Sequence, residues 1–254
     1  MPSRNNLREQ RCWAHPLGDC EGVISQEHYV SECLYPGGEI NVRGFPWCKD
    51  AFVPLPIRKL TSGILCVKHN NALSELDANA NIALNTMRDA MTLFTARDKM
   101  RSRRWTVHHF NVNMLLLERW CLKTLINIHF NGKWRFDPES DELGLPPEGL
   151  IRVAFGRSRF EGAAGLYFVS KVGAQISMIE GAISIGATTD GNRLVAGRFQ
   201  LWGLPFVLTL LPTAIHAVDG AALMRHEIKQ WFQTHDDKGR KVNSHLVIFT
   251  YPSK

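Results

Sequence analysis

The sequence predicts an α+β fold, because two segments repeat apolar residues with helical spacing and the chain after residue 149 contains short β-type runs. The chain has 254 residues, 44% hydrophobic and 21% charged, so it is long enough to bury a core and is neither disordered nor fibrous. Its net charge of +6 permits a polyanionic partner but does not identify one.

The first helical segment follows a stretch rich in turns and prolines. Residues 40–60 carry three prolines and little periodicity, which predicts a long loop. From residue 72 onward, apolar residues recur every three or four positions, and we expect a helix over 71–99 with one face on the core. These residues are Leu73, Leu76, Ala80, Ala83, Leu84, Met87, Met91 and Phe94.

The second helical segment, residues 113–130, has the sequence NMLLLERWCLKTLINIHF. Its apolar positions again have helical spacing, and Glu118, Arg119 and Lys123 fall on the other side. We therefore expect a helix with one packed face. The acidic, Pro-rich segment DPESDELGLPPE at 137–148 is typical of a boundary.

The rest of the chain predicts strands. The runs LIRVAFG, GLYFVS, AISIGATT, RLVAGRFQLW, FVLTLL and HLVIFTY are β-branched or aromatic, and Asp190-Gly191 is a hairpin signal between two of them. We divide the chain into residues 1–105 and 106–254, the second part being a helix plus a β-rich domain of unknown role. Its exposed-looking polar candidates, which belong to no motif, are Arg157, Arg159, Arg225 and His226.

The compartment is predicted from the N-terminus and the cysteines. The start, MPSRNNLREQR, is polar and basic and predicts neither a signal peptide nor an anchor. The longest uncharged run, residues 199–218, is interrupted by Gly203, Pro205 and Pro212, so we expect buried strands and no membrane span. A cytoplasmic chain of this size needs no disulfide framework, and the spacing of its six cysteines indicates metal binding.

Four residues form two candidate ligand pairs for zinc. Cys12 and Cys20 lie in CWAHPLGDC, and Cys66 and His69 lie in ILCVKHN, just before the first helix. His15 is an alternative to Cys20, although the turn at Gly18-Asp19 favours Cys20. The remaining cysteines, Cys33, Cys48 and Cys121, lack a partner at ligand spacing, and we expect them to be structural.

The adjacent Glu27 and His28 lie between these pairs, in ISQEHYVSE. The order C-x7-C, then Glu-His, then C-x2-H-N, then a helix resembles the HNH nucleases of the ββα-metal type, in particular their zinc-stapled branch, over about residues 8–85. The resemblance implies a treble-clef-like module of two strands and a helix around a structural zinc.

The resemblance also implies catalytic roles. His28 would be the general base and Glu27 a ligand of a catalytic Mg²⁺ or Mn²⁺, while Asn70 would orient the histidine by holding adjoining backbone. The third position, on the helix, is either Asp77 or Asn79. Asp77 is the stronger candidate, because a carboxylate binds a hard cation more strongly than an amide does.

The implied activity is metal-dependent endonucleolytic hydrolysis of DNA, with RNA not excluded, in phage biology or phage defence. The alternative is a non-catalytic zinc module that binds nucleic acid or protein, with the C-terminal domain as a sensor, a regulatory contact or a homo-oligomer interface. A basic cluster favours phosphate binding, but it is also explained by the preference for cations at a helix C-terminus. It consists of Arg97, Lys99, Arg101, Arg103 and Arg104, followed by Trp105.

Overall fold

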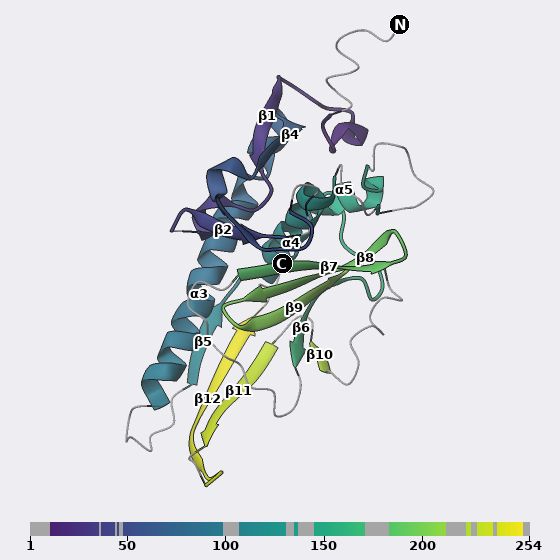
Figure 1. Ribbon diagram of the computed structural model, residues 1–254. Helices are drawn as coiled ribbons and strands as arrows, with labels where there is room; N and C mark the ends of the chain where they lie inside the picture. The colour runs from purple at the N-terminus through teal and green to yellow at the C-terminus, as the bar shows by residue number, and fades with distance from the viewer. Residues whose placement is uncertain are drawn as a thin grey trace, which may run out of the picture.

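The computed structural model confirms the α+β class (Figure 1). It describes residues 11–35, 37–43, 45, 48–98, 107–130, 135–136, 145–170, 183–211, 222–224, 228–235 and 238–250. In this part of the chain, no helix combines the length and the apolar character that crossing a bilayer requires.

The N-terminal part contains two strands followed by a helix. Strand β1 (Ile24–His28) pairs antiparallel with β4 (Thr61–Cys66), and β4 leads directly into α2 (Val67–Ala72) and α3 (Ser74–Asp98). The helix predicted over 71–99 is therefore present, but it begins four residues earlier and is interrupted at Leu73.

The long loop expected over residues 40–60 is wrong, because the connection between β1 and β4 contains a two-stranded hairpin. Strands β2 (Glu39–Val42) and β3 (Val53–Pro56) pair antiparallel and bury a small cluster of their own, which consists of Val42, Cys48, Ile57 and Leu60. The 3-10 helices η2 (Glu32–Leu34) and η3 (Ile57–Lys59) flank this hairpin. The two prolines of β3 made this segment look like a loop, because proline disfavours a central strand. Proline is tolerated here because both strands of a two-stranded hairpin are edge strands.

Helix α4 (Met114–His129) lies where it was predicted, but the expectation of a single packed face is wrong. Glu118 and Lys123 are only 4% and 2% exposed. Each is paired: Glu118 Oε2 accepts a hydrogen bond from the Leu166 backbone N–H at 2.7 Å, and Lys123 contacts carboxylates described below. The helix is buried nearly all round because its polar residues find partners inside the protein.

Helix α5 (Glu148–Ala154) overturns the strand expected for LIRVAFG. Ile151 and Val153 are buried on either side of exposed Arg152, which imitates the alternation of a strand. Pro147 precedes the first turn, and Arg152 pairs with Glu148 at 3.1 Å across one turn, so local interactions favour the helix.

The β-rich part follows the other predicted runs. Strands β6 (Gly165–Ser170), β7 (Ile183–Asp190), β8 (Arg193–Leu201), β9 (Leu204–Thr209) and β10 (Ala222–Met224) form an antiparallel sheet in the order β10-β6-β9-β8-β7. The predicted hairpin at Asp190-Gly191 joins β7 to β8, and Gly191 has the positive φ of +58° that the turn requires. The part of the run 199–218 that the structure describes lies in or beside β8 and β9, as expected.

A second sheet joins distant parts of the chain. Strand β12 (Lys241–Thr250) pairs antiparallel with β11 (Ile228–His235) and parallel with β5 (Val107–Asn111). Strands β5 and β12 contact α3, so this sheet lies beside that helix (Figure 1).

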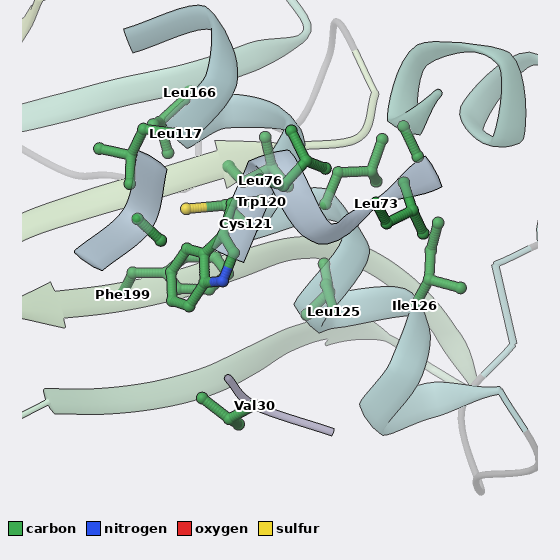
Figure 2. Packing of buried hydrophobic residues seen from close by; sticks show 14 of the residues in the cluster. Val30, Leu73, Leu76, Leu117, Trp120, Cys121, Leu125, Ile126, Leu166 and Phe199 are labelled. Carbon is green, nitrogen blue, oxygen red and sulfur yellow. The ribbon is translucent and has the colours of Figure 1, made fainter. Parts of the chain in front are cut away.

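One hydrophobic core crosses the division proposed at residue 105. Figure 2 shows Val30, Leu73 and Leu76 of the N-terminal part in one cluster with Trp120 and Leu125 of α4. The ring centroids of Trp120 and Phe199 in β8 are 6.2 Å apart. The two predicted parts thus share their apolar interior, with α4 between them.

Candidate metal centre and adjoining polar site

The four predicted zinc ligands converge. The potential ligand atoms of Cys12, Cys20, Cys66 and His69 all lie within 4.8 Å of one another. His69 Nδ1 is 3.4 Å from the sulfur of Cys12, 3.6 Å from that of Cys20 and 3.2 Å from that of Cys66. Tetrahedral zinc with ordinary bond lengths would separate a sulfur and a nitrogen ligand by about 3.6 Å. This group could hold a metal ion, and its geometry is compatible with zinc.

Local structure brings the ligands together. Cys66 ends β4 and His69 lies one turn into α2, while the short helix η1 (His15–Leu17) and the left-handed Gly18, with φ +76°, return the chain from Cys12 to Cys20. His15 does not belong to the ligand group, so the geometry favours Cys20 over His15. Burial raises the pKa of the Cys12 thiol to about 11, so a cation is needed to stabilise its thiolate at neutral pH.

The other nitrogen of His69 is held by an acidic residue. His69 Nε2 lies 2.9 Å from Asp19 Oδ1, and Arg157 donates to Asp19 Oδ2 at 2.9 Å. The hydrogen bond with His69, and to a smaller extent that with Arg157, holds the pKa of Asp19 well below its usual range. A carboxylate in this position fixes the tautomer that leaves Nδ1 free to bind a metal. Arg157, a candidate without a motif, thus connects the segment after α5 to the ligand group.

A second polar site lies beside the ligand group. Glu27 of β1, 5% exposed, and Asp77 of α3 both contact the ammonium group of Lys123 in α4. Lys123 Nζ lies 2.7 Å from Glu27 Oε1, 2.9 Å from Asp77 Oδ1 and 2.7 Å from Asp77 Oδ2. Burial raises the pKa of Glu27, an effect that the Lys123 charge opposes. The two carboxylates that the resemblance assigns to a divalent metal thus converge on the ammonium group of a lysine.

Further hydrogen bonds from α4 complete this site. Asn127 Nδ2 donates to Glu27 Oε1 and to the His28 carbonyl, both at 3.1 Å. Ser31 donates to Asp77, and Trp120 Nε1 donates to the Ser31 hydroxyl at 2.8 Å. Because Trp120, Lys123 and Asn127 are spaced by three and four residues, one face of α4 supplies all three.

His28 lies at the edge of the site. Its side chain is 31% exposed, and Nε2 is 3.6 Å from Glu32 Oε2, beyond hydrogen-bond distance. Within the described residues, this buried Nε2 atom has no hydrogen-bond partner. Glu27 and His28 are consecutive in a strand, so they point to opposite faces.

The role expected for Asn70 falls to another residue. Asn70 Nδ2 donates to the hydroxyl of Ser25 at 3.0 Å, and Ser25 bonds the Leu65 carbonyl of β4 at 3.2 Å, so Asn70 ties the start of the helix to the strand pair. The contact to the His28 backbone is made by Asn127.

The structure also separates the two candidates for the third position. Asp77 faces Glu27 across Lys123, whereas the buried Asn79 donates to the Asn113 carbonyl at 3.4 Å, at the start of α4. Lys123 and Asn127 were missed as site residues. The sequence could have indicated them, because each is a polar residue among mostly apolar residues of the helix.

Several other candidates have simpler outcomes. Cys48 and Cys121 are buried, as expected of structural cysteines, whereas Cys33 is exposed with its sulfur 3.8 Å from the Asp77 carbonyl. Arg159 is exposed. Lys99, Arg101, Arg103, Arg104, Trp105, Arg225, His226 and the side chain of Arg97 lie outside the described residues.

Comparison with protein-family models, with curated proteins and with solved structures gives no match for this chain. Arguments about function therefore rest on the geometry of the two sites and on the motif order.

Proposed function

We propose that the chain is a zinc-stapled endonuclease of the HNH type that hydrolyses phosphodiester bonds in DNA, with RNA as a second possible substrate. The observation that carries the proposal is the convergence of Glu27 from the strand pair and Asp77 from the helix on one cation. His28 follows Glu27 in the sequence of β1. The strand–strand–helix order and the adjoining Cys₃His group are further support.

Zinc is the metal that best suits the Cys₃His group. Three thiolates and one imidazole in tetrahedral reach are the ligands of structural zinc sites, and four protein ligands leave no position for water. Cys12, Cys20, Cys66 and His69 would hold such a zinc, which would fix the loop 12–20 against the start of α2 without taking part in hydrolysis. None of the six cysteines forms a disulfide, as expected in a reducing cytoplasm, and we place the protein there.

The second site has the donor chemistry for a hard divalent cation. Carboxylate oxygens are the ligands that Mg²⁺ and Mn²⁺ prefer, and the Lys123 ammonium serves as a stand-in that marks where the Glu27 and Asp77 oxygens converge. A divalent cation held by these residues would supply charge neutralisation at the phosphate and at the leaving oxygen.

His28 is the residue suited to activate water. Its Nε2 accepts or donates no hydrogen bond within the described residues and lies 3.6 Å from Glu32 Oε2, so it is available to take a proton from water. Asn127 holds the backbone of His28 through its carbonyl, and Asn70 holds β1 to the start of the helix, so both are positioning residues.

Cleavage of supercoiled plasmid and of labelled single-stranded DNA and RNA, by zinc-loaded protein with Mg²⁺ or Mn²⁺, tests the proposal. We expect His28→Ala to lower the rate by about 10²- to 10⁴-fold, as for loss of a general base, with zinc content and thermal stability unchanged. His15→Ala, a histidine outside both sites, is the matched control. Cleavage by His28→Ala at the wild-type rate would refute the proposal.

The second candidate function is a zinc module that binds nucleic acid or protein without cutting. It is favoured by the Lys123 ammonium, which already satisfies both carboxylates. Absence of cleavage on every substrate with both metals, combined with salt-dependent binding of DNA in a gel-shift or anisotropy assay, would select this alternative.

A further inference from the structure

We infer that Lys123 competes with divalent cations for the Glu27–Asp77 pair, so that its charge sets how tightly the site holds a metal. The inference deepens the proposed function, since it concerns the same site, but it depends on ion binding and not on cleavage.

The first argument is the saturation of the ammonium group. A lysine ammonium has three N–H donors, and three carboxylate oxygens lie within 2.9 Å of Lys123 Nζ. The same oxygens are those that a metal would need. The Lys123 ammonium therefore occupies the position between the two carboxylates that a metal ion would take. None of its three N–H donors remains for a phosphate.

The second argument is that α4 is anchored in place on several sides. Arg119 donates to the Ala154 carbonyl of α5 at 3.0 Å, Glu118 accepts from the backbone of β6, and Trp120 donates to Ser31. With its helix fixed and its side chain only 3% exposed, the Lys123 ammonium cannot swing into water without disturbing this packing. A divalent cation must displace it against these contacts.

The third argument is charge balance. Two carboxylates and one ammonium leave one negative charge, so the pair still attracts cations while Lys123 is present. Without the ammonium, a divalent cation would balance both carboxylates. Replacing Lys123 by a neutral side chain of similar length should therefore strengthen metal binding.

The test is titration of zinc-loaded protein with Mn²⁺, with free Mn²⁺ followed by its electron paramagnetic resonance signal. Lys123→Met keeps the length of the side chain and removes the charge, and we expect it to bind one Mn²⁺ at least about tenfold more tightly than wild type does. Lys59→Met removes the same charge from an exposed lysine in η3 and should match wild type. Adding Asp77→Asn to Lys123→Met should abolish the gain, which assigns the ion to this pair.

Stability is the second measurement, because Lys123→Met leaves two carboxylates without their counter-ion. We expect its melting temperature to fall and Mn²⁺ to restore it, with no comparable Mn²⁺ effect on Lys59→Met. Equal Mn²⁺ affinity of wild type and Lys123→Met would overturn the inference. So would a Lys123→Met chain that neither folds alone nor folds with Mn²⁺, because the metal would then be unable to replace the ammonium.

These outcomes separate the inference from the proposed function. Tighter Mn²⁺ binding by Lys123→Met without any cleavage supports the competition and refutes the nuclease. Cleavage that depends on His28, combined with unchanged Mn²⁺ affinity in Lys123→Met, supports the nuclease and refutes the competition.

Discussion

The indole nitrogen of Trp13 donates a hydrogen bond to Asn127 Oδ1 at 3.0 Å, across 114 positions in sequence. Trp13 follows the ligand Cys12, and the amide nitrogen of Asn127 contacts Glu27 and the His28 carbonyl. One buried asparagine therefore links the metal-ligand loop to the polar site.

Asn127→Leu should be strongly destabilising. Leucine has nearly the same volume but leaves the Trp13 N–H, the Glu27 carboxylate and the His28 carbonyl without this partner. Since each unsatisfied buried group costs about 1–3 kcal/mol, we expect the free energy of unfolding in urea to fall by about 3 kcal/mol or more. Asn71→Ala, at an exposed position of α2, should change it by less than about 0.5 kcal/mol. A similar small change for Asn127→Leu would show that water replaces these hydrogen bonds.

Zinc content should depend on Cys20 and not on His15. We expect one zinc per chain by elemental analysis, and a cobalt-substituted protein with the absorption bands of thiolate ligation. Cys20→Ser should lose metal and Cys33→Ser, an exposed cysteine outside the group, should keep it. Because such sites contribute on the order of 10 kcal/mol to folding, chelation should unfold the N-terminal part. Purified protein without stoichiometric zinc would contradict this.

Gly197 of β8 should resist substitution because α4 packs directly on it. A Cβ at this position would lie 2.9 Å from Phe199 Cε2 and 3.1 Å from Leu125 Cδ1 and Cδ2. We expect Gly197→Ala to lower the free energy of unfolding by about 1–3 kcal/mol. Gly186→Ala, in the paired strand β7 with no atom within 4 Å of its Cβ position, is the matched control. Equal stability of the two variants would mean that α4 does not sit on this sheet as described.

His129 should make stability depend on pH. Burial lowers the pKa of this histidine at the end of α4 to about 4, against about 6.5 in the unfolded chain. Between these values the unfolded state binds a proton that the folded state does not, so stability falls as pH falls. From pH 7 to pH 5 we expect wild type to lose about 2 kcal/mol more than His129→Gln, by urea unfolding at each pH. Parallel pH profiles for the two proteins would contradict the assignment.

The convergence of the four candidate metal ligands could be predicted because spacing along the chain determines it. Cys66 and His69 lie one turn apart at the start of a helix, and the Gly18 turn returns Cys20 toward Cys12. The pairing of Glu27 with Asp77 also followed from motif order. These contacts depend on local geometry near β1, β4 and α3.

Lys123 and Asn127 could not be predicted in this way. They act through the docking of α4, and a polar residue on a helix has the same local pattern whether it meets water or a buried carboxylate. The same difficulty explains α5, in which Ile151 and Val153 are both buried although the segment is helical. Tertiary contacts, which periodicity does not encode, decided both cases.

Helix α4 is synthesised after all four candidate metal ligands, which affects the acidic pair during translation. All four metal ligands lie between residues 12 and 69, so a nascent chain can load its metal early in synthesis. Lys123 is translated only later, and the sheet that supports α4 later still. Until then Glu27 and Asp77 lack their ammonium partner, so a nascent chain that had bound a metal through these four residues would present the acidic pair without its counter-ion.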